Sequence, residues 1–298
     1  MPVQSRRYKL LADFERVYQF LQETYDPVTL NSYLLPQFWE YGHSHSYFNH
    51  KLTHRMGLWE DNAIGDGVGA LVGIVSYEFD LGDCHMHVRP GYEALLPELL
   101  AWAEKELCKI KRGRRSLQFW ITDKEPAKRE LLQANGYKLK RTDKNMIFDY
   151  KNAFVERTLP EGFTLIDGTG MDYAKLHACY WKGFDHGPRP SKDVDGRYQM
   201  YSGPRADLSL TTIVVAPNGE YACALGMWYD ERNHYAYLEP LATVPKYRRM
   251  GLATVALTEA MKKTKALGAR YCFGGSREFY TAIGFEAIGN SEFWKKEW

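Results

Sequence analysis

Residues 248–253 lie between a run typical of a β-strand, which ends near Thr243, and a run whose apolar residues recur at helical spacing. A loop that opens a helix directs unpaired backbone N–H groups toward one point, and the positive end of the helix dipole adds to their effect. Gly251 leaves room for a large anion, and Arg248 and Arg249 add positive charge. This arrangement suits the binding of a pyrophosphate.

The same stretch resembles the acetyl-CoA signature of the GNAT N-acetyltransferase superfamily, Gln/Arg-x-x-Gly-x-Gly/Ala. Arg248, Gly251 and Ala253 stand at its three defined positions. The preceding residues 242–247 are also similar to the family, and a Tyr-x-x-x-Gly-Phe element follows at 280–285. The resemblance covers residues 160–298. It implies an acyltransferase that moves an acetyl group from acetyl-CoA directly to a primary amine, without a metal.

The resemblance also implies which residues hold acetyl-CoA. In the family, the strand before the loop separates from its neighbour, and its backbone groups bind the pantetheine arm. By position these groups belong to Leu241, Ala242 and Thr243. The loop and the first helical turn would bind the pyrophosphate through Arg248, Arg249, Met250, Gly251, Leu252, Ala253 and Thr254.

Direct transfer from a thioester to an amine requires a base that accepts the amine proton and an acid for the departing thiolate. Glu239 lies on the strand before the loop and is the candidate base, acting directly or through a water molecule. Because side chains alternate along a strand, Tyr237, Glu239 and Leu241 are expected on one face, so Glu239 reaches the cleft only if that face does. A salt bridge is the alternative role for Glu239.

Tyr280 is the candidate acid, because the family often has a tyrosine there whose hydroxyl protonates the thiolate of CoA. Packing in the core is the alternative role for this side chain. Residues 274–276, Gly-Gly-Ser, stand where many relatives carry an asparagine that contacts the cofactor, so the sequence departs from the family at that point.

The acceptor amine is expected near the cleft between two domains, since ligand sites favour domain interfaces. Residues 180–190 mix aromatic and charged side chains that could line its pocket or form an ordinary half-buried helix end. Residues 38–50 are rich in histidine, but no cysteine or carboxylate cluster with ligand spacing accompanies them, so a loop over the cleft is expected there rather than a metal site. A small amine, an amino sugar, and a peptide N-terminus or lysine all remain open as acceptors.

The elements that must position these residues follow from hydrophobic periodicity. For the C-terminal half we expect the order β-α-α-β-β-β-α-β-α-β-β. The strands are expected near 163–166, 210–215, 221–229, 235–243, 270–273, 286–288 and 292–295, and the helices near 171–184, 192–201, 253–267 and 277–283. The last two strands are expected to pair with each other.

The N-terminal half reads in the same order, with helices at 13–24 and 30–41 and a closing strand pair at 137–140 and 145–150. Its counterpart of the phosphate loop lacks the Arg-x-x-Gly-x-Ala element, and Glu93 places negative charge there. We therefore expect an α/β (α+β) fold of two tandem GNAT-like domains, each a mixed sheet flanked by helices. Residues 1–152 would form a degenerate copy, and residues 153–298 the copy that binds acetyl-CoA.

Composition agrees with two ordinary globular domains. The chain has 298 residues, of which 45% are hydrophobic and 26% charged. A formal net charge of +2 disfavours nucleic acid as the partner. Neither a signal peptide nor an apolar run long enough for a membrane is present, and the five cysteines lack zinc-site spacing. These features predict a cytoplasmic protein with reduced thiols, either a monomer or a homodimer.

Two rival functions use the same features. A regulatory protein could bind acyl-CoA without transferring the acyl group. An aminoacyl transferase that uses a charged transfer RNA also has a two-copy acyltransferase architecture, but the near-neutral charge and the intact CoA-type loop argue against it.

Overall fold

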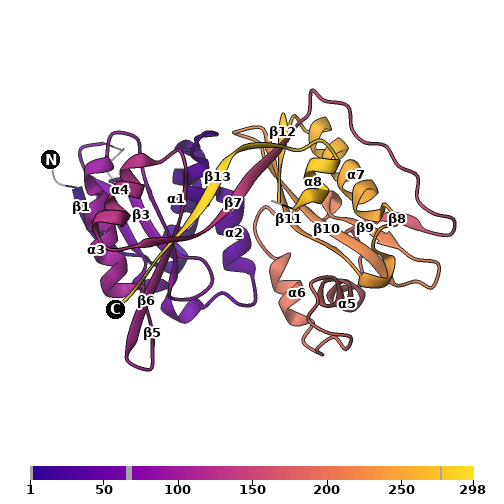
Figure 1. The fold of residues 1–298 in the computed structure, drawn as a ribbon, viewed down its shortest axis with the longest axis horizontal. Helices are drawn as coiled ribbons and strands as arrows, with labels where there is room; N and C mark the ends of the chain where they lie inside the picture. The colour runs from indigo at the N-terminus through magenta and orange to yellow at the C-terminus, as the bar shows by residue number, and fades with distance from the viewer. Residues whose placement is uncertain (1–2, 65–68, 276) are drawn as a thin grey trace. The chain divides into compact units, whose positions relative to one another are not determined.

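A computed structural model describes residues 3–64, 69–275 and 277–298 (Figure 1). The chain forms two compact units. Unit 1 comprises Met1–Lys144 and Ile288–Trp298, and unit 2 comprises Asn145–Ala287. Each unit is a mixed sheet with helices on both faces, which confirms the expected fold class. The units divide at Lys144 rather than at the predicted boundary after residue 152.

Unit 1 carries its sheet in the order β1-β2-β3-β4-β6-β13, with β5 beside β6. Helices α1 and α2 cover one face and α3 and α4 the other (Figure 1). The strands are β1 Val3–Arg7, β2 Gly57–Asp61, β3 Ala70–Tyr77, β4 Asp83–Val88, β5 Lys109–Lys111, β6 Arg114–Thr122 and the end of β13. The helices are α1 Leu10–Glu23, α2 Pro36–Ser44, α3 Leu96–Glu106 and α4 Pro126–Ala134, with short 3-10 turns at Leu30–Tyr33, His50–Arg55 and Glu93–Leu95.

Unit 2 carries its sheet in the order β12-β11-β10-β9-β8, and the end of β7 pairs with β12. Helices α5 and α6 lie on one face, and α7 and α8 on the other (Figure 1). The strands are β8 Thr164–Asp167, β9 Thr212–Val215, β10 Tyr221–Asp230, β11 Tyr235–Thr243 and β12 Tyr271–Gly274. The helices are α5 Tyr173–Gly183, α6 Asp195–Met200, α7 Leu252–Ala266 and α8 Glu278–Ala282, with 3-10 turns at Leu208–Leu210 and Pro245–Tyr247.

The expected closing strand pairs were wrong in both halves. Each predicted pair is one long strand, β7 Lys138–Asp149 and β13 Glu286–Glu297. Residues 146–149 of β7 pair with β12 in unit 2, and residues 291–297 of β13 pair with β6 in unit 1. The Asn290 side chain donates to the Asp123 carboxylate at 2.8 Å, which continues the ladder of unit 1 instead of closing a hairpin. Each sheet thus contains a strand from the other half of the sequence.

The helix expected at residues 30–41 begins late. Leu30, Asn31, Ser32 and Tyr33 all have positive φ, between 50° and 65°, which no right-handed helix accommodates. Helix α2 starts at Pro36, where proline suits the first helical position. The histidine-rich stretch expected as a loop is helical to Ser44.

All five cysteines are free and buried, as predicted. Within the described part of the chain, no helix is long and apolar enough to cross a membrane. Nor do three or more His, Cys, Asp or Glu side chains gather there as metal ligands.

Candidate functional site

The parallel strands β11 and β12 separate in the middle of unit 2. Their ladder joins Tyr235 to Tyr271, Ala236 to Cys272 and Tyr237 to Phe273. Strand β11 then runs on to Thr243, while in the described residues the ladder with β12 goes no further. Backbone groups of β11 beyond Tyr237 therefore lie on an edge that β12 leaves, and this part of β11 leads directly into the predicted phosphate loop.

A bulge in β11 lies at the point of separation. Leu225 of β10 is opposite Leu241, and Met227 is opposite Leu238, so one residue of β10 faces two of β11. That one residue is Gly226, where a Cβ atom would approach the carbonyl oxygen of Glu239 to 2.4 Å, closer than real contacts allow. Gly226 thus permits the bulge. Sequence reasoning missed it, although Gly226 in β10 and Pro240 in β11 are both local signs of a bulge.

The bulge changes which side chains share a face. Leu238 belongs to the apolar cluster under α7 with Leu257, and Leu241 packs against the same cluster. Ala242 faces the other way, toward Gly183 of α5. The expectation that Glu239 and Leu241 share a face was therefore wrong, since the extra residue shifts the alternation. Glu239 follows Leu238 and so lies on the α5 side of the sheet, half-buried.

The loop before α7 has the geometry of an anion-binding helix start. Arg249 and Gly251 have left-handed φ values of 66° and 79°, and Gly251 is the residue that caps α7. The first helical hydrogen bond runs from the Val255 N–H to the Gly251 carbonyl at 3.2 Å. The N–H groups of residues 252–254 precede that bond and point out of the helix N-terminus. No side chain caps α7.

The Arg248 guanidinium turns away from these N–H groups, toward α5. Its Nε donates to the Thr243 carbonyl at 3.2 Å, and its Nη2 donates to the Gly183 carbonyl at 2.8 Å. The same Nη2 lies 3.0 and 3.1 Å from the two carboxylate oxygens of Asp185. Gly183 and Asp185 lie in the stretch 180–190 that was considered for the acceptor pocket, but the sequence did not indicate their contact with Arg248, because they are far from the motif along the chain.

Tyr280 lies beside the end of β12. Cβ atoms on Gly274 and Gly275 would both come within 2.8 Å of its ring, so these glycines give the tyrosine its place. Its hydroxyl end lies near Gly275, just past the last β11–β12 pair. The ring also packs edge-on against Phe285, with centroids 5.2 Å apart, and the side chain is 9% exposed. Tyr280 is thus both a core residue and a neighbour of the strand separation.

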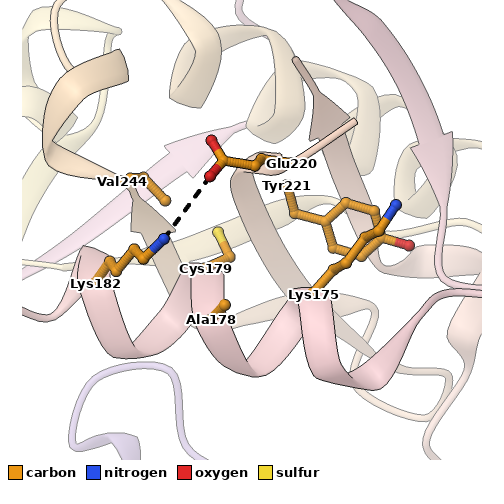
Figure 2. A pocket seen from close by; sticks show the side chains of 7 residues that line it. All are labelled: Lys175, Ala178, Cys179, Lys182, Glu220, Tyr221 and Val244. Carbon is orange, nitrogen blue, oxygen red and sulfur yellow. Dashed lines mark ion pairs between the residues drawn. The ribbon is translucent and has the colours of Figure 1, made fainter. Parts of the chain in front are cut away.

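Two cavities of unit 2 adjoin the start of the loop. The larger one, of about 480 Å³, lies between the loop and the segment after α5. Its lining residues are Lys182, Asp185, Gly187, Pro188, Val244, Pro245 and Lys246. The smaller one, of about 70 Å³, shares Lys182 and Val244 with it, and Figure 2 shows Lys182 reaching toward Glu220, 3.8 Å away, above Cys179.

Glu220 is an ionised carboxylate on this rim. Hydrogen bonds from Lys246, Asn218 and Tyr247 lower the pKa of Glu220 to about 2. Burial raises the pKa of the Cys179 thiol well above its usual value, so this side chain lines the smaller cavity as a neutral group. The rim of the loop therefore carries lysines together with two carboxylates, those of Glu220 and Asp185.

The segment after α5, which was expected to cover the acceptor, is a polar and aromatic cluster. The Tyr180 and Tyr201 hydroxyls lie 3.0 Å apart, and Arg197 lies over the Tyr180 ring at 5.2 Å. His177 Nε2 lies 3.1 Å from the Ser191 hydroxyl. Burial and the nearby Arg197 charge lower the pKa of His177. These contacts order the connection between α5 and α6.

Unit 1 contains a second pair of parallel strands that separate, β4 and β6. Their ladder covers only Asp83 with Gln118 and Cys84 with Phe119, and β4 continues to Val88. Here the left-handed turn at Leu30–Tyr33 packs against both strands.

Side chains of α4 and of the turn at Leu30–Tyr33 also connect β4 to its surroundings where β4 and β6 separate. Lys128 Nζ donates to the Met86 carbonyl at 2.9 Å, to the Glu125 carboxylate at 2.6 Å and to the Ser32 hydroxyl. Ser32 in turn donates to Glu125 at 2.7 Å, and the Lys128 and Glu125 side chains are only 6% and 9% exposed. A buried, fully paired cation therefore joins both sides of the separation.

The loop of unit 1 also differs from the loop of unit 2. Gly91 has a left-handed φ of 90°, like Gly251, but its N–H donates to the Glu93 carboxylate at 3.0 Å. A side chain of the same loop thus takes the position of an anion.

Three histidines of unit 1, His43, His85 and His87, are buried and neutral. Burial lowers the pKa of His43 to about 3 and that of His85 to about 4, and lowers that of His87 well below its usual value. His43 Nδ1 lies 2.9 Å from the Trp39 carbonyl, and His87 Nε2 lies 2.8 Å from the Thr24 hydroxyl. Their hydrogen bonds are to the unit's own helices.

Comparisons with known proteins agree with this geometry. Residues 174–285 match the model of the acetyltransferase (GNAT) family, whereas no curated protein matches the chain. A GCN5-related N-acetyltransferase from Sphaerobacter thermophilus shares 16% identity at a TM-score of 0.64, over 100% of this chain and 96% of its own. A tandem GNAT protein from the clavulanic acid biosynthesis pathway shares 14% identity at a TM-score of 0.62, over 99% of this chain and 98% of its own.

A more distant relative has the same arrangement. The N-myristoyltransferase of Saccharomyces cerevisiae, solved with bound myristoyl-CoA, shares 11% identity at a TM-score of 0.58, over 99% of this chain and 79% of its own. At such identities the likeness concerns the fold. The chain therefore carries a domain of the acetyltransferase (GNAT) family at residues 174–285, within a fold that it shares with a tandem GNAT protein.

Proposed function

We propose that unit 2 is an N-acetyltransferase that transfers the acetyl group of acetyl-CoA directly to a primary amine. The observation that carries the proposal is the separation of β11 from β12 after Tyr237, immediately before a loop that presents N–H groups at the start of α7. A strand edge and a helix N-terminus in series suit a ligand with an amide-containing arm and a pyrophosphate.

The residues around this path fit acetyl-CoA. Backbone groups of Leu241, Ala242 and Thr243 would bind the pantetheine arm, and the N–H groups of residues 249–254 would bind the pyrophosphate. Gly251 has no Cβ, and a Cβ there would lie 3.2 Å from Arg157 Cδ, so a side chain larger than glycine would crowd the helix start.

The chemistry assigned to the chain is proton transfer on either side of the thioester. When bound, acetyl-CoA supplies an activated acyl group, whose C–S bond breaks as the C–N bond forms. Glu239, on the α5 side of β11, would accept the proton that the amine loses. Tyr280, beside Gly275, would donate a proton to the leaving thiolate and recover one from solvent. The products are an amide and free CoA.

We also propose that unit 1 binds no acyl-CoA, so that each chain holds one molecule. Lys128, Glu125 and the turn at Leu30–Tyr33 join β4 to its surroundings where unit 2 has its candidate groove. Glu93 would repel a pyrophosphate at the loop. The acceptor is proposed to be a small-molecule or peptide amine.

Calorimetric titration of acetyl-CoA tests the proposal. Wild type should bind one molecule per chain, and Gly251→Glu should abolish binding because a carboxylate would fill and repel the pyrophosphate site. Gly91→Glu is the matched control, since Gly91 has the same left-handed backbone in unit 1, and it should bind like wild type. Retained binding in a folded Gly251→Glu protein would refute the placement of the cofactor.

An assay of thiol release with a panel of amines then separates the enzyme from the regulatory alternative. An acetyltransferase releases free CoA when at least one amine is present, in amounts that match the acetylated amine. A regulatory protein binds acetyl-CoA with the same stoichiometry and releases none with any of the amine classes.

A further inference from the structure

We infer that Arg248 is a positioning residue, which holds residues 249–254 in the shape that binds acetyl-CoA, and that its side chain does not itself bind phosphate. This inference rests on the proposed function of unit 2. It concerns how the loop obtains its shape before any ligand arrives.

The guanidinium of Arg248 is already committed to three acceptors from three parts of unit 2. Nε bonds the carbonyl of Thr243 at the end of β11, and Nη2 bonds both the carbonyl of Gly183 at the end of α5 and the carboxylate of Asp185 beyond it. Nε and Nη2 form one edge of the planar guanidinium. That edge spans the junction between the strand, the helix and the loop.

The junction itself is unusually close. A Cβ on Gly183 would lie 2.7 Å from the Cβ of Ala242 and 3.3 Å from the N atom of Thr243, so the backbone of α5 contacts the end of β11. The Gly183 carbonyl belongs to the last turn of α5, where carbonyls lack helical partners and a cation is favoured by the dipole. Arg248 satisfies this carbonyl and thereby fixes the distance from α5 to the loop.

The residues that follow need such support. Arg249 is a non-glycine residue with φ of 66°, a conformation that persists only where surrounding contacts hold it. If the loop were free to relax, binding would have to order it again, and this cost would appear as weaker affinity. Arg248 is adjacent to Arg249 in the chain, so its bonds restrain the point where the left-handed turn begins.

Arginine and lysine make different predictions for this role. A lysine keeps the positive charge but has no planar fork, so it cannot bond two carbonyls and a carboxylate in fixed directions. If Arg248 positions the loop, Arg248→Lys should weaken acetyl-CoA binding about as much as Arg248→Ala, by roughly tenfold. In both variants kcat at saturating acetyl-CoA should stay close to that of wild type.

Calorimetry with acetyl-CoA and steady-state kinetics would measure these effects. Lys262→Ala is a matched control, because the Lys262–Glu156 pair on the surface of unit 2 has the same side-chain exposures as the Arg248–Asp185 pair, 43% and 66%. Asp185→Ala leaves both carbonyl bonds of Arg248 in place and should weaken binding less than Arg248→Ala does. Combined with Arg248→Ala, it should add nothing further.

Hydrogen exchange of the ligand-free protein gives a readout that needs neither activity nor cofactor. The hydrogen-bonded amides on either side of the turn, Arg248 and Val255, should exchange faster in Arg248→Lys than in wild type, and at the wild-type rate in Lys262→Ala. Wild-type affinity and wild-type exchange in Arg248→Lys, with loss of affinity in Arg248→Ala, would overturn the inference in favour of a direct charge contact. If wild type binds no acetyl-CoA, the proposed function fails, and the exchange rates still decide whether Arg248 holds the loop.

Discussion

The two units contain the same pair of separating parallel strands but use it differently. In unit 1, α4 has nine residues, and its first turn places Glu125 and Lys128 against the Ser32 turn and the Met86 carbonyl. In unit 2, α8 has five residues and begins after the point where β11 and β12 part, with Tyr280 beside the end of β12. One extra helical turn therefore distinguishes a strand pair joined by a buried ion pair from a candidate groove.

The polar residues on β4 of unit 1 and on β11 of unit 2 also differ. Val88 of β4 packs with Leu99 of α3, just as Leu238 of β11 packs under α7, so His87 and Glu239 lie on corresponding faces. His87 is neutral and bonded to Thr24, whereas Glu239 is a half-buried carboxylate. Catalytic and structural versions of one fold can thus differ in a few side chains at one place.

Among the substitutions that test this comparison, Lys128→Met is expected to have the largest effect, a loss of unfolding free energy. Removing the cation leaves the Glu125 carboxylate buried with only hydroxyl and N–H donors, which should cost about 3–5 kcal/mol of unfolding free energy. Urea unfolding, followed by hydrogen exchange at β4 and at Leu30–Tyr33, measures it. Lys262→Met, at an exposed ion pair, should change stability by no more than about 0.5 kcal/mol.

A double variant separates the ion pair from general packing. Adding Glu125→Leu to Lys128→Met should restore much of the lost stability, because no charge is then left buried. A single-variant loss below about 1 kcal/mol would mean that the pair is not what joins β4 to α4.

The next effect concerns the acid and the base proposed for unit 2. Glu239→Gln and Tyr280→Phe should each lower kcat about 100-fold, because each removes a proton-transfer group while keeping shape. Glu239→Gln should recover activity as pH rises, since more of the amine is then neutral without help. Leu132→Met, in the core of unit 1 and five residues before Tyr137 as Tyr280 is before Phe285, should leave kcat unchanged. Full activity of Tyr280→Phe would assign that side chain to the core alone.

The smallest effect is a difference in acid sensitivity between the units. His43 and His85, with pKa values of about 3 and 4, stay neutral in folded unit 1, while in the unfolded chain they take up protons below about 6.5. Their contribution to the free energy of unfolding is therefore complete above pH 6.5 and is lost as pH falls toward 4.

His85→Asn keeps a side-chain N–H donor but does not titrate. Between pH 7 and pH 5, unit 1 of this variant should lose about 2 kcal/mol less stability than wild type. Hydrogen exchange at β4 as a function of pH measures the difference, with β11 of unit 2 as the internal reference. An unchanged pH dependence would show that His85 is not protonated on unfolding in this range.

Local sequence signals were sufficient for the position of the loop and for the order of elements in unit 2 from β8 to α8. The helical spacing after Pro245 and the left-handed glycine at 251 are short-range features, and the structure has α7 begin at Leu252. The cofactor and catalytic roles of these residues stay predictions. The mirrored order of the N-terminal half was visible for the same reason, because periodicity depends only on neighbours.

Long-range pairing could not be read from these signals. The residues between the two expected closing strands include Asn290, whose side chain bonds Asp123, 167 positions earlier in the chain. The turn at Leu30–Tyr33 contains no glycine, so nothing local marked its left-handed backbone. The bulge opposite Gly226, and the bond from Arg248 to Asp185, likewise depend on contacts between distant segments.

The exchange of strands has a consequence for how the protein is made. Strand β6 ends at Thr122, but its partner in β13 is synthesised much later, and Asp123 and Asn290 are 167 positions apart. At translation rates of 5–20 residues per second, this separation corresponds to a delay of about 8–33 s. During that time the nascent unit 1 exposes the edge of β6, and an unpaired strand edge can pair with another chain. A chain cut between the two halves would keep that edge exposed permanently.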